Sequence, residues 1–103
     1  GQTKCMRFGT NVHHIKDNLF SIPPLFLEIQ KASGTSDAEM HQVYNMGHRL
    51  EAYFLPKHAE QVIAISQSFW IDAQIIGRTE HSERPDQANH VTIRRPGVEL
   101  FYG

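Results

Sequence analysis

The sequence predicts an α+β domain in which one mixed β-sheet has helices packed on it. Two segments that follow prolines carry apolar residues at helical spacing, and several short segments alternate apolar and polar residues as half-buried strands do. The chain also ends in two strand-like segments separated by a Pro-Gly pair. With 103 residues, 40% of them hydrophobic, we expect one domain, residues 1–103, with one core.

The first third of the chain holds a weak strand pattern and a strong helix pattern. Residues 3–8 alternate weakly and predict a strand, Gly9-Thr10-Asn11 predicts a turn, and residues 12–20 fit either a helix or a strand. After Pro23-Pro24, apolar residues recur at helical spacing. We expect a helix there that closes at Gly34, where glycine can adopt the left-handed conformation.

The middle of the chain predicts two helices and a strand. Ser36 and Glu39 have the spacing of a capping box, so a short helix should run to about Tyr44. Residues 48–54 alternate as a half-buried strand does. Pro56 then begins a helix whose apolar stripe should pack on the sheet. The stripe consists of Ala59, Val62, Ile63 and Phe69.

The C-terminal part predicts strands with one long loop. Residues 71–80 should form a second strand, and the polar residues 81–89 should form the longest loop. Residues 90–94 and 98–102, separated by Pro96-Gly97, have the pattern of a β-hairpin.

Composition excludes several classes of partner. A net charge of -1 gives no electrostatic reason to bind nucleic acid or an anionic membrane. No apolar run approaches the roughly 20 residues that a membrane span needs. A single cysteine cannot form an internal disulfide and suits a reducing compartment. We therefore expect no nucleic-acid partner, no membrane and a cytoplasmic location.

Residue types that carry chemistry lack the spacing of a known site. The adjacent His13 and His14 should point to opposite faces of a strand, and His41 and His48 are separated by a turn. Cys5 is expected to be buried in a strand, the alternative being a nucleophile with a histidine base beside it in space. The glycines form neither a Walker A nor a GxGxxG motif. We predict no metal site and leave the catalytic residues unassigned.

One turn, Asn45-Met46-Gly47-His48, adjoins the predicted strand at residues 48–54. Asparagine and glycine are typical turn residues, and composition alone favours a simple chain reversal. The other interpretation is that the turn presents groups to a ligand from a rigid scaffold.

The order of motifs resembles one family. "SIPPLFLEIQ", "EMHQVYNMG", "PKHAEQVIAI" and "IIGRTE" follow one another as in the C-terminal portion of phosphoribosylformylglycinamidine cyclo-ligase, also called aminoimidazole ribonucleotide synthetase. The opening "GQTK" is similar to the continuation of a glycine-rich run that would lie upstream, so we expect a C-terminal domain of a longer chain. The chain departs from the family at Tyr44, usually Phe, and at His48-Arg49, where a small apolar residue often follows the glycine.

The resemblance implies a ligase of de novo purine biosynthesis. Its substrate would be formylglycinamidine ribonucleotide, and its reaction would be the ATP-dependent closure of the imidazole ring of aminoimidazole ribonucleotide. ATP and Mg²⁺ would bind mainly outside these residues, on the enzyme's own N-terminal ATP-binding domain. The full-length enzyme would be a homodimer, and these 103 residues alone would be inactive.

The resemblance also places the turn near an interdomain cleft. It implies three substrate-binding residues: Asn45 as a polar contact or as the group that fixes the turn, Gly47 as backbone that permits close approach, and His48 as a phosphate contact. The alternative is a free-standing α+β ligand-binding or interaction module that has the same fold without catalysis.

Overall fold

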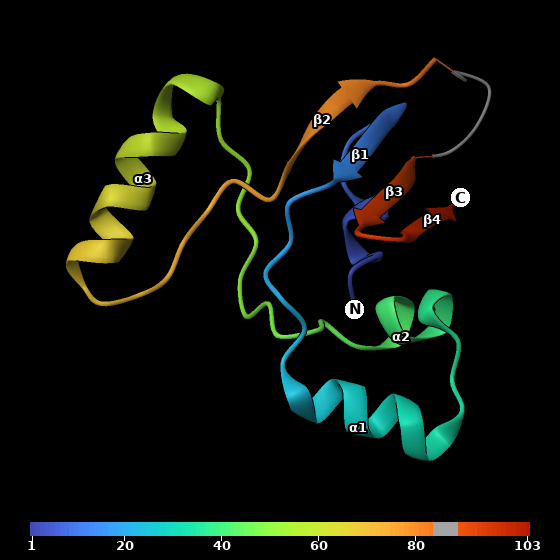
Figure 1. Cartoon of the computed structure of the whole chain (residues 1–103). Coiled ribbons are helices and arrows are strands. Elements are labelled where there is room, and N and C mark those ends of the chain that lie inside the picture. Colours follow the sequence, from blue (N-terminus) through green and yellow to red (C-terminus); the bar gives the residue numbers. More distant parts are fainter. Residues whose placement is uncertain (84–88) are drawn as a thin grey trace.

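The computed structural model describes residues 1–83 and 89–103 of the chain, so part of the loop expected at 81–89 lies outside the described residues. It confirms the α+β class, with one mixed sheet and helices (Figure 1). The elements are η1 (Lys4–Arg7), β1 (Val12–Lys16), α1 (Pro24–Ser33), α2 (Asp37–Val43), α3 (Pro56–Ser68), β2 (Gly77–His81), β3 (His90–Arg95) and β4 (Val98–Tyr102).

The sheet has the strand order β2-β1-β3-β4. The central strands β1 and β3 are parallel, whereas β1 with β2 and β3 with β4 pair antiparallel. All three α-helices lie in the connection from β1 to β2, which leaves the sheet and returns to its edge (Figure 1). The segment that was ambiguous at 12–20 therefore begins as a strand.

The core lies around β3, one of the two central strands of the sheet. Val91 and Ile93 of β3 are fully buried with Cys5 of η1. Partly buried side chains from η1, β4 and the segment after β1 pack against them; these are Met6, Leu19, Leu100 and Tyr102. Met40 of α2 is also fully buried. Among the described residues, no helix has both the length and the apolar character of a membrane span.

The predicted helix boundaries and the hairpin are confirmed. Gly34 closes α1 with a left-handed φ of 69°, and the Ser36 hydroxyl accepts a hydrogen bond from the Glu39 N–H at 3.2 Å to begin α2. Pro56 is the first residue of α3. Gly97, with a φ of 74°, turns β3 into β4.

The strand expected at residues 3–8 is wrong. Residues 4–7 form the 3₁₀-helix η1, in which Met6 N–H bonds the Thr3 carbonyl at 3.1 Å and Phe8 N–H bonds the Cys5 carbonyl at 3.0 Å. The N-terminus is fixed to α2 by the bond from Gln2 N–H to the His41 carbonyl at 2.8 Å. This anchor holds the segment beneath the sheet, so Cys5 is buried as expected but in a helix.

The strand expected at residues 48–54 is also wrong, and the one at 71–80 is too long. Residues 49–54 run irregularly between the turn and α3, with Leu50 86% exposed, and regular pairing of β2 begins only at Gly77. Strand-like sequence forms a strand only where a neighbouring strand satisfies its main chain. Within the described residues, no such neighbour lies beside residues 49–54.

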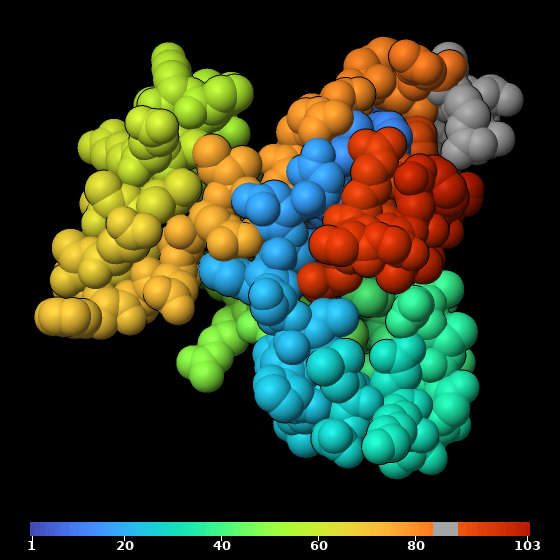
Figure 2. Space-filling view, viewed as in Figure 1, coloured from blue at the N-terminus to red at the C-terminus, as the bar shows by residue number. Residues whose placement is uncertain are grey.

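The expectation that α3 packs on the sheet is contradicted as well. None of its residues is buried, and Phe69, directly after it, is 71% exposed. Figures 1 and 2 show α3 set apart from the sheet. The Cα radius of gyration is 14.6 Å, larger than the roughly 13 Å expected for a compact domain of this length. The helix forms from its local sequence, but among residues 1–83 and 89–103 no element packs closely on its apolar stripe.

Replacing one isoleucine in the core and one in α3 should lower the free energy of unfolding to different extents. We expect Ile93→Ala to lower the free energy of unfolding by about 2–5 kcal/mol, because it empties a packed site between β1 and β4. The matched change Ile63→Ala in α3 should alter it by less than about 0.5 kcal/mol. Urea denaturation of both variants measures this, and equal losses would contradict the position of α3.

Candidate functional site

The predicted site residues lie in a tight turn between α2 and the irregular segment that leads to α3. The His48 N–H bonds the Asn45 carbonyl at 3.2 Å, and Met46 and Gly47 have positive φ angles of 56° and 96°. Two positive φ angles at the central positions are characteristic of a type I′ turn. A methionine there is strained, and its fully buried side chain holds it in place.

Asn45 is exposed, and its side chain both fixes the turn and leaves a donor available. Its Oδ1 accepts the Gly47 N–H at 3.1 Å, which is an Asx turn. Its carbonyl also accepts Gln2 Nε2 at 2.6 Å, which ties the turn to the N-terminus. Among the described residues, the Asn45 Nδ2 amide has no hydrogen-bond partner. The structure shows Asn45 fixing the turn, and its role as a polar contact to substrate stays a prediction.

Gly47 packs against the proline that precedes α1. A β-carbon at this position would lie 2.6 Å from Pro23 Cγ and 2.8 Å from Pro23 Cδ. Together with its positive φ, this contact restricts the position to glycine. The exposed Gly47 main chain is accessible to an approaching group.

His48 is buried, unlike Asn45 and Gly47. Its Nε2 accepts the Phe20 N–H at 3.2 Å, and its ring lies 5.1 Å from the Phe20 ring. Burial lowers the pKa of His48, and Glu51 only partly opposes this effect. Since Nε2 accepts the Phe20 N–H, the neutral ring carries its proton on Nδ1, and it connects the turn to the segment after β1. Because the bond to Phe20 uses Nε2, a phosphate contact would have to be made through the Nδ1–H, and this contact stays a prediction.

A buried lysine cluster near the turn was not predicted. Lys16 Nζ, at the end of β1, donates to the Gln2 carbonyl at 2.7 Å, to Gln2 Oε1 at 2.8 Å and to Glu51 Oε2 at 2.9 Å. The Lys16 side chain is almost fully buried, so all three donors must be satisfied in this way. No sequence pattern joins these three residues, because they lie far apart along the chain.

Cys5 and the adjacent histidines of β1 make further contacts near this cluster. Burial raises the pKa of the Cys5 thiol, whose Sγ donates to the Gln2 carbonyl at 3.6 Å. A protonated thiol is a poor nucleophile at neutral pH, which favours the structural role of Cys5. His14 meets the Tyr53 ring edge-on at 5.8 Å, and His13 stacks on His90 at 4.1 Å. The adjacent histidines thus make contacts in different directions.

A cleft of about 660 Å³ lies between the sheet and α3, and His14, Lys16, Glu51 and Tyr53 are among the residues that line it. Its polar floor contains His14, Lys16 and Glu51, and Gly47 and His48 lie at its edge. The remaining walls are largely apolar. They include Leu50, Phe54, Val62, Ile63, Trp70 and Ile75.

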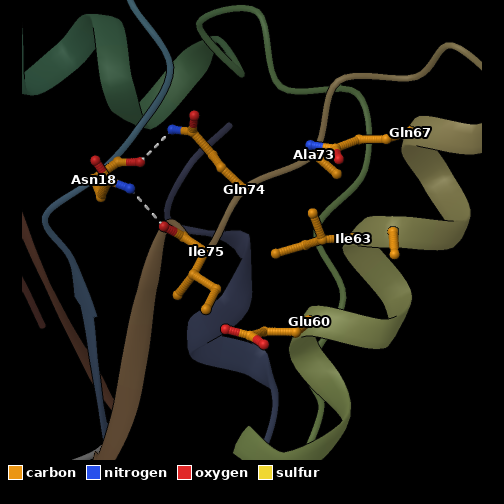
Figure 3. A pocket seen from close by; sticks show the side chains of 8 residues that line it. Asn18, Glu60, Ile63, Gln67, Ala73, Gln74 and Ile75 are labelled. Atoms are coloured by element: carbon orange, nitrogen blue, oxygen red, sulfur yellow. Dashed lines mark hydrogen bonds between the residues drawn. The ribbon is translucent and has the colours of Figure 1, made fainter.

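An adjoining hollow of about 430 Å³ separates α3 from residues 73–75 (Figure 3). Gln74 Nε2 donates to the Asn18 carbonyl, and Asn18 Nδ2 donates to the Ile75 carbonyl, both at 2.7 Å. Figure 3 shows Ile63 and Glu60 extending from α3 toward this strip. Within residues 1–83 and 89–103, no group of three or more His, Cys, Asp or Glu side chains could hold a metal ion.

Comparison with known proteins confirms the resemblance. No protein-family profile matches the chain. A phosphoribosylformylglycinamidine cyclo-ligase from Methanococcus vannielii is 38% identical over 80 residues, 78% of this chain and 23% of that protein. Enzymes of the same name from Methanococcus maripaludis and Methanocaldococcus jannaschii are each 35% identical, over 82 and 79 residues. The chain is homologous to these proteins over about four-fifths of its own length and spans about a quarter of theirs.

The contact between the turn and Pro23 can be measured with two glycine variants. Gly47→Ala and Gly34→Ala both place alanine at a positive φ, which costs roughly 1–2 kcal/mol. Only Gly47→Ala also forces a β-carbon into Pro23, whereas the space around Gly34 is open. We expect the loss for Gly47→Ala to exceed that for Gly34→Ala by about 1–3 kcal/mol in urea denaturation. Equal losses would show that the turn does not pack on Pro23.

The buried histidines should make the fold sensitive to mild acid. Burial lowers the pKa of His14, His41 and His48, so the unfolded chain binds protons first as the pH falls below about 6.5. In His41, Nε2 accepts Arg95 Nε at 2.9 Å and cannot be protonated without losing that bond. The stability that these neutral histidines contribute is fully present above pH 7 and is lost as the pH falls.

We expect the free energy of unfolding to fall by at least about 1 kcal/mol from pH 7 to 5.5, a range that lies above the titration of ordinary carboxylates. His41→Gln should reduce this pH dependence, and the exposed His58→Gln should leave it unchanged. Urea denaturation at several pH values measures the slope. A flat profile would contradict the burial of neutral histidines.

Proposed function

We propose that this chain forms one wall of the active site of phosphoribosylformylglycinamidine cyclo-ligase. It matches about a quarter of the length of the relatives that carry this name. The observation that carries the proposal is the identity of 35–38% to three cyclo-ligases across some four-fifths of the chain. The enzyme would act in de novo purine biosynthesis in the cytoplasm.

The proposed reaction closes the imidazole ring of aminoimidazole ribonucleotide. ATP phosphorylates the formyl oxygen of formylglycinamidine ribonucleotide, which converts that oxygen into a good leaving group. A nitrogen of the same substrate then attacks the activated carbon, and ADP and phosphate are released. The protein mainly has to position the reactants and balance the phosphate charge. We assign ATP and Mg²⁺ chiefly to an N-terminal ATP-binding domain in a homodimeric enzyme.

We assign the turn at residues 45–48 to substrate binding. The Asn45 Nδ2 amide supplies an exposed donor, and the Gly47 main chain permits close approach at the edge of the cleft. His48 would position the turn through its bond to Phe20 and, as the resemblance suggested, contact a substrate phosphate through its Nδ1–H. This arrangement presents backbone and amide groups from a turn that is fixed on several sides.

A hybrid enzyme tests the proposal. In it, the matched quarter of the Methanococcus vannielii relative is replaced by this chain, and ATP-dependent formation of aminoimidazole ribonucleotide is measured. We expect the hybrid to be active and this chain alone to be inactive. A folded but inactive hybrid would favour the alternative, an α+β ligand-binding or interaction module without catalysis.

In the hybrid, Asn45→Ala and Asn45→Asp separate the two roles of Asn45. Aspartate keeps the oxygen that accepts the Gly47 N–H but loses the Nδ2 donor. If Nδ2 contacts substrate, both variants should lose about tenfold or more in kcat/KM, which corresponds to roughly 1.4 kcal/mol. Only Asn45→Ala should also lower the melting temperature. Full activity of Asn45→Asp would leave Asn45 a role in the turn alone.

A further inference from the structure

The apolar walls of the cleft are exposed to an unusual degree. Large hydrophobic side chains from residues 50–54 and from the segment after α3 are more than half exposed; those that line the cleft are Leu50, Tyr53, Phe54, Trp70, Ile71 and Ile75. Trp70 reaches 97%. Single exposed apolar residues are ordinary, but a contiguous group that lines a hollow is characteristic of an interaction surface.

Unpaired main chain runs along the same cleft. Residues 49–54 alternate as a strand does, yet within the described residues their backbone N–H and C=O groups bond no other main chain. The edge strand of the sheet, β2, also contributes to this cleft, because its residues 77–79 line it. Unpaired strand groups are a template for an added strand.

We propose that the cleft binds an extended polypeptide segment from the part of the cyclo-ligase that this chain does not span. The segment would pair its main chain with residues 49–54 and cover the apolar face of α3 with alternate side chains, which is strand addition. This inference rests on the proposed function for the identity of the partner. In the complex, residues 49–54 would become the strand that their sequence predicts.

Two observations favour a polypeptide over a small molecule. Six extended residues span roughly 20 Å, and only another chain can satisfy a row of main-chain groups of that length. The curated relatives also contain about three-quarters of their length outside the matched segment, which supplies such a chain. A second copy of this chain is the competing occupant, and the experiment below includes it.

The test mixes this chain with the polypeptide of the Methanococcus vannielii relative from which the matched residues are deleted. This chain carries 5-fluorotryptophan at Trp70, its single tryptophan, so that ¹⁹F NMR reports the cleft alone. We expect a complex in sedimentation, a shifted ¹⁹F signal, and at least tenfold slower amide exchange at residues 49–54. Ile63→Asp should weaken binding at least tenfold, whereas Gln61→Asp, on the outer face of α3, should not.

The following outcomes of the docking measurements overturn the inference. No complex, or a complex in which Ile63→Asp binds equally well, would show that the cleft is not the docking site. Self-association of this chain alone, with the same protection of residues 49–54, would make a second copy the occupant. Ring closure is assayed separately: a complex that docks through the cleft without activity would refute the proposed function and leave the docking inference standing.

Discussion

The parallel pairing of β1 with β3 is the constraint on which the rest of the structure depends. It joins His13 to His90 and Lys16 to Ile93, residues more than 70 positions apart, and it buries β3 on both sides. Closing so long a loop costs conformational entropy before any contact compensates for it. Core residues from η1, the antiparallel edge strands and the buried lysine cluster all assemble on this pair. Of the helices in the connection, α2 packs against β4, its Met40 is fully buried and its His41 accepts a bond from Arg95 of β3, whereas α3 buries none of its residues.

Local signals in the sequence predicted local structure correctly. The capping serine at Ser36, the glycine at Gly34 and the proline at Pro56 each act on the adjacent turn of helix, so their effects do not depend on distant residues. The errors arose where a segment needs a partner. In the part of the chain that the structure describes, residues 49–54 have a strand pattern without a neighbouring strand, and α3 has an apolar stripe without a surface to cover it.

The candidate site divides in the same way. The turn at Asn45 and Gly47 was predicted because asparagine and glycine specify it within four residues. The cluster that joins Lys16 to Gln2 and Glu51 was not, since it depends on tertiary contacts that bring the N-terminus and the cleft wall to the end of β1. The inward orientation of His48 likewise follows from packing on Phe20, which composition does not reveal.

The single cysteine and the single tryptophan occupy opposite extremes of solvent exposure. Cys5 is 5% exposed in the core under β3, and Trp70 is 97% exposed beside the cleft. A thiol reagent can reach Cys5 only when the core opens, so the rate of modification counts excursions of the β1–β3 pair out of its native state. The fluorescence of the Trp70 indole, in contrast, reports changes at the cleft that this residue lines, just after the end of α3. The chain thus carries two intrinsic reporters, one for the opening of its scaffold and one for the occupancy of its surface.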